Sequence, residues 1–190
     1  MSPRSVAELT ALLDAGRKPK YLLFWGHQPQ PDGSIGQGCL SQWWPAAFTV
    51  DGQRFATAEH YMMWRKATLF GDTATAARIL SAGHPQEAKG LGREVRRFDQ
   101  AAWERERYAV VLAGSVAKFG QDPALRAYLL GTGQRVLVEA SPVDAVWGIG
   151  LSARDDGAWD PRRWRGLNLL GFALMEAREL LAGTDQPIAP

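Results

Sequence analysis

Hydrophobic residues recur at intervals of three and four along several parts of the chain, with polar residues between them. This period places the apolar side chains on one face of an α-helix. The longest such segment is 101–119, and Thr57 suits the N-cap of a helix that carries Glu59 in its first turn. We therefore expect helices at residues 6–13, 58–69, 73–81, 85–91, 101–119, 123–130 and 167–181.

Short runs of aromatic and β-branched residues indicate a few strands. Residues 21–25 and 136–138 have the length and composition of strands. Residues 48–50 and 53–55 flank Asp51-Gly52, a pair that readily adopts the positive φ angles of a tight hairpin turn. The elements together predict an α+β fold, a single, mostly helical domain with a small β-sheet.

Two segments lack any period and are rich in residues that form loops. Residues 27–38 are dense in Pro, Gly and Gln, and residues 141–165 in Gly, Asp and Trp. A long irregular segment inside a compact domain usually carries function. We expect an N-terminal extension with a short helix at 1–20, one domain at 21–182 with no linker, and a flexible tail at 183–190.

Charge and composition narrow the classes of function. The chain has 22 Lys and Arg against 20 Asp and Glu, a net charge of +2, which argues against nucleic-acid binding by overall charge. The single Cys39 excludes an intramolecular disulfide, and His27, His60 and His84 lack metal-ligand spacing, so neither a metal nor a cofactor is expected. No apolar run has the length of a signal peptide or a membrane span, which favours a cytoplasmic protein with no membrane partner.

The expected helix at 58–69 carries the first candidate for chemistry. Glu59 and Lys66 are seven residues apart, nearly two turns, so they share a face and lie roughly 10 Å apart along the axis. That spacing could bracket a sugar. The alternative is a solvated face with a capping Glu59 and an exposed Lys66, and for His60 a place in the core or on the surface.

A second candidate is the segment from Asp144 to Gly150. A carboxylate three residues before Trp147, followed by glycines that allow close backbone approach, suits recognition of a ribose or a base beside a stacking ring. Alternatively, Asp144 holds a turn and Trp147 fills a gap in the core.

Two further segments carry weaker signals. Gly166 to Gly171 begins the last helix, where free backbone amides attract phosphate and Asn168 could add a donor; plain capping is the alternative. The aromatic pair Trp43-Trp44, beside Ser41, could form a stacking wall, or it could belong to the core.

Taken in order, these pieces resemble the NADAR (YbiA-like) family, and the match runs from Tyr21 to Leu181. A single piece says little, but the ordered set is specific. The segments that carry the resemblance are Phe24-Trp25, Leu40-Ser41, Trp43-Trp44-Pro45, Thr57 to Tyr61 with Lys66, Lys118-Phe119, Thr132-Gly133, Val138 to Ala140, Asp144, Trp147 to Leu151, and Gly166 to Gly171.

The resemblance implies an N-glycosidase that cleaves the bond between ribose and an exocyclic amine. The implied substrates are a phosphoribosylamino pyrimidine of the riboflavin pathway or ADP-ribosylated guanine in DNA or RNA. The implied catalytic residues are Glu59 as proton carrier, Lys66 as amine nucleophile and Asp144, which with Trp147 would hold the ribose and base. The implied substrate-binding residues are Trp25, Ser41, Trp44, His60, Trp147, Gly148 and Asn168.

Two other functions fit the same pattern. One is a non-catalytic module that binds ADP-ribose or a nucleotide, although the presence of both Glu59 and Lys66 favours the enzyme. The other is an interaction domain whose aromatic residues only form its core. Substrate choice is expected to depend on segments 27–38 and 152–164, where arginines such as Arg162 could meet a pyrophosphate or a DNA backbone.

Overall fold

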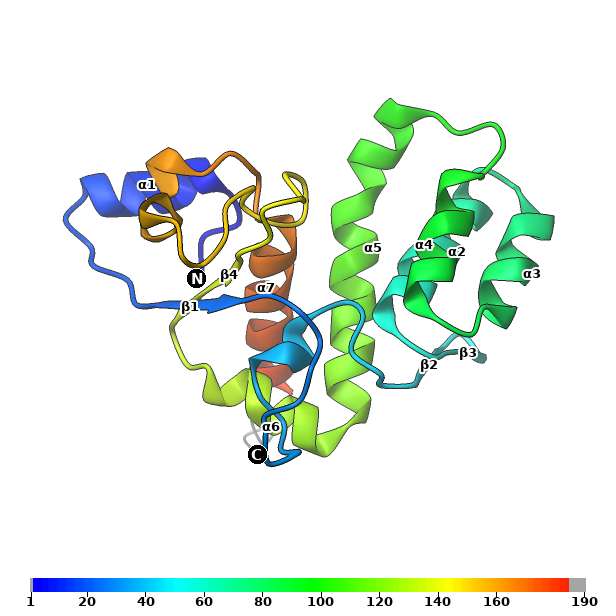
Figure 1. The fold of residues 1–190 in the computed structure, drawn as a ribbon, viewed down its shortest axis with the longest axis horizontal. Coiled ribbons are helices and arrows are strands. Elements are labelled where there is room, and N and C mark those ends of the chain that lie inside the picture. Colours follow the sequence, from blue (N-terminus) through cyan, green and yellow to red (C-terminus); the bar gives the residue numbers. More distant parts are fainter. Residues whose placement is uncertain (1, 185–190) are drawn as a thin grey trace, which may run out of the picture. The chain divides into compact units, whose positions relative to one another are not determined.

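A computed structural model describes residues 2–184 of the chain, and it confirms an α+β fold that is mostly helical (Figure 1). The last part of the expected tail, 185–190, lies outside the described residues. The helices are α1 (Val6–Asp14), α2 (Ala58–Leu69), α3 (Thr73–Ser81), α4 (Pro85–Arg93), α5 (Gln100–Gln121), α6 (Pro123–Gly131) and α7 (Leu169–Gly183). The strands are β1 (Tyr21–Phe24), β2 (Phe48–Val50), β3 (Gln53–Phe55) and β4 (Val136–Glu139), and three short 3₁₀ turns are η1 (Gln37–Leu40), η2 (Asp156–Trp159) and η3 (Pro161–Arg163).

Helix boundaries follow the capping residues. Ser5, Thr57, Asp72 and Asp99 each accept a backbone N–H in the first turn of the helix that follows, at α1, α2, α3 and α5. The last helix begins at Leu169, two residues later than expected, because Asn168 has a left-handed backbone with φ of 52°. Local capping chemistry therefore fixed most helix starts, and a backbone turn fixed the last one.

The described chain forms two compact units, although the sequence contains no linker. The first unit combines residues 2–41 with residues 123–184, and the second is the continuous stretch Gln42–Asp122. The chain thus leaves the first unit once and returns to it. Each unit has its own buried core.

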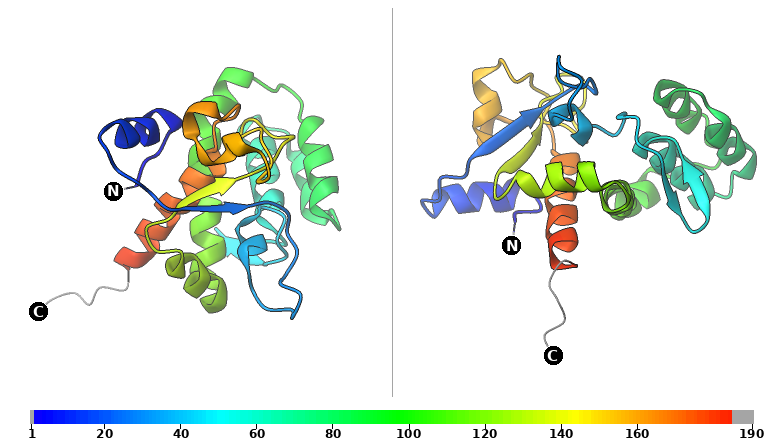
Figure 2. Two further views of the ribbon diagram at one scale, coloured as in Figure 1. Left: turned by 60° about the vertical axis from the view of Figure 1, so that its left-hand side comes forward. Right: turned by 90° about the horizontal axis from the view of Figure 1, so that it is seen from below.

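The first unit is built on two parallel strands. β1 pairs with β4 in register from Tyr21 opposite Val136 to Phe24 opposite Glu139, and Figure 2 shows the two strands side by side in both views. Helix α7 packs against β4 and α6 packs against α7. The sequence predicted both strands but not their pairing, because more than 100 residues separate them. The core of this unit includes Phe24, Leu125, Leu129, Leu137, Leu170 and Phe172.

The second unit is a helical group with a hairpin. Helix α2 contacts α3, α4 and α5 (Figure 1), and β2 pairs antiparallel with β3. The turn residues Asp51 and Gly52 have φ of 49° and 78°, which confirms the expected hairpin. Tyr61 packs its ring against Phe48 and Phe55, and this contact fixes the hairpin on α2.

The irregular segment 141–165 is ordered by contacts within itself and with α1. Its 3₁₀ turns η2 and η3 pack together, and Arg162 forms an ion pair with Asp14 at the end of α1. The indole nitrogen of Trp164 donates to the carbonyl of Ala158 at 2.9 Å. Within residues 2–184, no helix has both the length and the apolar character needed to cross a membrane.

Candidate functional site

The start of α2 is fixed by a buried pair, Thr57 and His60. The Thr57 hydroxyl lies 2.8 Å from Nδ1 of His60, and Nε2 of the ring lies 3.1 Å from the carbonyl of Ala82. A carbonyl only accepts, so Nε2 carries the proton and Nδ1 accepts from Thr57. Burial lowers the pKa of His60, which favours this neutral ring. Both ring nitrogens are thus used within the protein, which favours a structural role over the expected substrate contact.

Glu59 occupies the first turn of α2 and is almost completely buried. The residue is only 3% exposed, and its backbone N–H donates to the carbonyl of Gln42 at 3.0 Å. The N-terminal end of a helix stabilises a carboxylate. A carboxyl group held here is shielded from bulk water, so the solvated face considered from the sequence is wrong for Glu59.

Lys66, two turns further along α2, lies in a half-buried aromatic site. Its Nζ donates to the carbonyl of Gly92 at 2.7 Å. The same atom lies 4.2 Å from the ring centroid of Phe98 and 6.0 Å from that of Trp103. The expected alternative of an exposed lysine is therefore wrong, because residues 26 to 37 positions later in the chain cover this amine.

The surroundings of Lys66 lower its pKa. Burial is the larger cause, and the positive charge of Arg93 is the second. Both disfavour the ammonium form, whereas the face of the Phe98 ring favours it. The result is an amine whose pKa lies below the ordinary value, as a lysine nucleophile requires.

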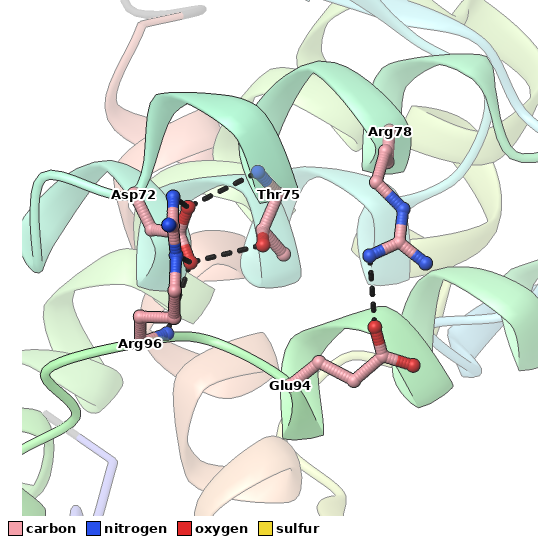
Figure 3. A network of polar contacts seen from close by, with 5 residues as sticks. All are labelled: Asp72, Thr75, Arg78, Glu94 and Arg96. Carbon is pink, nitrogen blue, oxygen red and sulfur yellow. Dashed lines mark hydrogen bonds and ion pairs between the residues drawn. The ribbon is translucent and has the colours of Figure 1, made fainter.

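The loop between α4 and α5 carries Phe98 and is held by a buried carboxylate. Asp72 accepts from Arg96 through the backbone N–H at 2.9 Å and the guanidinium at 2.8 and 3.2 Å, and it also accepts from Thr75. Figure 3 shows Arg96 lying along this carboxylate, with the exposed pair Arg78 and Glu94 nearby. The Arg96 guanidinium, with these hydrogen bonds, holds the pKa of Asp72 far below its usual range.

Three of the expected substrate-binding residues, Trp25, Ser41 and Trp44, differ in their exposure. Trp25 directly follows β1 and is 60% exposed, whereas Ser41 and Trp44 are half-buried. The carbonyl of Phe24 accepts from Ala140, so Trp25 leaves the parallel pair at the carboxyl end of its strands. Ligands of parallel sheets bind at this end. An exposed indole there is available for stacking.

Asp144 holds a tight turn at the same end of the first unit. Its Oδ1 accepts from the backbone N–H of Val146 at 2.9 Å and of Trp147 at 2.8 Å. The turn fixes the direction in which the half-buried Trp147 leaves the backbone. The structural role considered from the sequence is therefore present for Asp144, and one carboxylate oxygen serves it.

Gly148 and Asn168 connect this turn to α7 and β4. A Cβ on Gly148 would lie 2.8 Å from the carbonyl oxygen of Glu139, so the close approach that needs glycine is to the protein's own backbone. Asn168 is fully buried; its Oδ1 accepts from the N–H of Glu139 and its Nδ2 donates to Leu137, both at 2.9 Å. These contacts favour structural roles for both residues.

The first backbone amides of α7 are also used within the protein. The N–H groups of Leu169 and Leu170 donate to the carbonyls of Val146 and Trp147, each at 3.2 Å. An anion site at a helix N-terminus needs free amides. Two of the donors that a phosphate site at this helix start would use are therefore engaged within the protein.

Each unit brings together part of the expected set. In the second unit, Glu59, His60 and Lys66 share α2, and in the first unit the turn at Asp144 joins Trp147, Gly148 and Asn168. No local pattern in the sequence pointed to the residues that surround Lys66, which are Gly92, Arg93, Phe98 and Trp103. Over residues 2–184, no cluster of three or more His, Cys, Asp or Glu is arranged to hold a metal ion.

Comparison with known proteins places the chain in a family. An N-glycosidase of Acanthamoeba polyphaga mimivirus is 40% identical over 165 residues, which are 84% of this chain and 95% of that protein. N-glycosidase YbiA of Escherichia coli is 35% identical over 139 residues, 73% of this chain and 77% of that protein. The NMR structure of the E. coli protein YbiA matches with a TM-score of 0.69 and 28% identity, covering 90% of this chain and 91% of that one. The names agree with the expected hydrolase of N-glycosyl bonds, and because the NADAR domain model matches residues 23–182, the chain belongs to the NADAR domain family.

Proposed function

We propose that this protein is an N-glycosidase that hydrolyses the bond between ribose and an exocyclic amine, with Lys66 as nucleophile and Glu59 as proton carrier. The observation that carries the proposal is the environment of Lys66. Its amine is half-buried beside Phe98 and Trp103, its pKa is lowered, and it shares α2 with the buried carboxyl group of Glu59.

The reaction follows from the chemistry of a ribosylamine. The nitrogen lone pair forms a double bond to C1′ as the bond from C1′ to the ring oxygen breaks, and Glu59 gives a proton to that oxygen. The free amine of Lys66 then adds to C1′. After proton transfer, the original amine leaves with its electron pair, and the sugar remains joined to Lys66 as an iminium. Water adds to C1′, and its proton transfers allow Lys66 to leave as the free amine, which releases the ribose.

The resting contacts of Lys66 suit such a cycle. The carbonyl of Gly92 accepts a hydrogen bond from Nζ whether the amine is charged or neutral, so it orients the group in both states. The aromatic rings exclude water from one side. Side chains on a helix lean toward its N-terminus, and Glu59 lies in the first turn of the same helix, which is the direction the proposed chemistry needs.

The substrate classes proposed here are a phosphoribosylamino pyrimidine and ADP-ribosylated guanine in nucleic acid. Both carry phosphate, and the exposed Arg93, whose charge acts on Lys66, is suited to meet it.

In the first unit, we propose that Trp147 and Trp25 stack on the base and that Asp144 contacts the ribose. Trp147→Ala should raise KM through lost stacking worth ~1–3 kcal/mol. An unfolded Trp147→Ala protein would instead assign Trp147 to the core.

The experiment that tests the function uses both substrates. Purified protein is incubated separately with ADP-ribosylated guanine DNA and with the phosphoribosylamino pyrimidine, and released base and sugar are measured. Borohydride added during turnover should reduce the iminium and leave a sugar mass on the peptide that contains Lys66. Binding of ADP-ribose without release from either substrate would favour the non-catalytic module, the alternative that the sequence left open.

A further inference from the structure

A pocket of about 870 Å³ lies in the first unit, at the end of the parallel strands opposite to Trp25. Lys20, which directly precedes β1, and Val136, the first residue of β4, both line it. Its position at the amino ends of the strands separates it from the turn at Asp144, which follows the carboxyl end of β4. The volume falls within the range of small-molecule sites, ~300–1,000 Å³.

One part of the pocket lining is apolar. Helix α1 contributes Leu9 and Leu12, and α7 contributes Met175 and Ala182. Leu9 and Met175 are buried, so the open apolar surface is that of Leu12, which is 37% exposed, and of the exposed Ala182. Such a surface accepts the flat or aliphatic body of a ligand. The remaining apolar lining residues are Pro3, Pro19, Leu130 and Val136.

The other part of the lining is strongly basic. Five cationic side chains and one carboxylate, that of Glu179, line the same pocket, and the cations are Arg17, Lys18, Lys20, Arg135 and Arg178. The carboxylate of Glu179 already accepts from the backbone N–H of Ser2. Such an excess of positive charge over a partly apolar surface favours an anionic ligand.

Arg178 gives this excess a directed donor. The residue is only 6% exposed, and its Nη1 donates to the Thr132 hydroxyl at 2.7 Å and to the carbonyl of Arg135 at 3.0 Å. Within residues 2–184, the Arg178 side chain makes no other hydrogen bond. The N–H groups of Nε and Nη2 therefore have no protein acceptor there. A guanidinium that is buried, anchored on one nitrogen and open at the others is suited to phosphate.

We propose that this pocket binds a small molecule that carries a phosphate group on an apolar or aromatic body, with the phosphate at Arg178 and the basic rim. Residues 2–20 supply nearly half of the lining, and they precede the match to the NADAR domain at 23–182. The site is therefore a property of this chain with its N-terminal helix, and it is additional to the proposed glycosidase chemistry.

Adenosine 5′-monophosphate is a suitable probe, with inorganic phosphate and adenosine as its two halves. In calorimetric titrations of the whole chain, we expect the monophosphate to bind more tightly than either half. If adenosine bound as tightly as the monophosphate, the cations would have no role in binding. If phosphate alone bound as tightly, the apolar surface would have none.

Variants assign the binding to the pocket. The double variant Lys18→Ala with Lys20→Ala changes two exposed side chains. It should weaken binding of the monophosphate about tenfold and leave Tm and glycosidase turnover unchanged. Arg54→Ala with Arg105→Ala removes the same charge elsewhere and should leave affinity intact. Arg178→Lys keeps the charge without the fork and should also weaken binding. The proposal would be overturned if the Lys18/Lys20 and Arg54/Arg105 double variants lost affinity equally. It would also be overturned if the Lys18/Lys20 variant lost none.

Discussion

The ring of Phe98 covers the amine of Lys66, with Nζ 4.2 Å from the ring centroid, although the two residues lie on different elements. Phe98 also packs edge-on against Phe70, with 5.3 Å between the ring centroids. The position of the ring therefore depends on the loop that Arg96 ties to Asp72. The ion pair of Asp72 and Arg96 therefore helps to position the ring that covers the proposed nucleophile, Lys66.

Lys66→Arg should abolish turnover while leaving the positive charge in place. A guanidinium stays protonated and cannot form the iminium with C1′. The native protein should give a borohydride-trapped sugar adduct on Lys66, and the variant should give none, as measured by peptide mass. Full activity in the variant, with no adduct in the native protein, would mean that water attacks C1′ directly.

Glu59→Gln should lower kcat by ~10²-fold or more, because a positioned proton carrier contributes about that much. The amide is close in shape to the buried carboxyl group, so the fold should survive, as judged by Tm and circular dichroism. Glu87→Gln, in the first turn of α4 in the same unit, is the matched control and should retain normal turnover. Normal kinetics in a folded Glu59→Gln protein would exclude the acid–base role.

Arg93→Met should move the pH profile of the reaction. The charge of Arg93 helps to lower the pKa of Lys66, so its removal raises that pKa. Less free amine is then present near neutrality, and the rising limb of kcat/KM should shift to higher pH. Arg105→Met, an exposed arginine on α5, should leave the limb in place. A higher KM with an unmoved limb would indicate that Arg93 only contacts substrate.

Asp72→Asn should change the pH dependence of the protein's stability at acidic pH. The pKa of Asp72 is lowered in the folded state, so its stabilisation is complete above the unfolded pKa of about 3.9 and is lost as the pH falls below it. The Tm of the native protein should exceed that of the variant near neutrality, and the gap should narrow below about pH 4. Glu94→Gln breaks only an exposed pair and should have little effect. A constant gap across this range would contradict the assignment.

Asn168→Ala should destabilise the protein by about 3 kcal/mol, because the N–H of Glu139 and the carbonyl of Leu137 lose their buried partner. Alanine also disfavours the left-handed backbone at this position. Asn168→Gly removes that backbone cost and should recover roughly 1 kcal/mol in denaturant unfolding. Equal stability of the Ala and Gly variants would show that the backbone conformation contributes nothing.

The sequence by itself determined the elements whose cause is local. Thr57 and Asp72 cap the helices that follow them because their side chains reach backbone amides within one turn. Asp51-Gly52 forms the hairpin turn because both residues tolerate positive φ. The family resemblance, which rests on ordered motifs, was likewise readable without coordinates.

Only the tertiary structure decided which distant residues meet. The pairing of β1 with β4, the cover of Lys66 by Phe98 and the use of Asn168 as a bridge to β4 join residues from 29 to over 100 positions apart. A helical period states that Lys66 lies on a face, but it carries no information about what packs on that face. The lowered pKa of Lys66 comes from burial and from Arg93, and both arise only when α4 and the loop after it fold against α2.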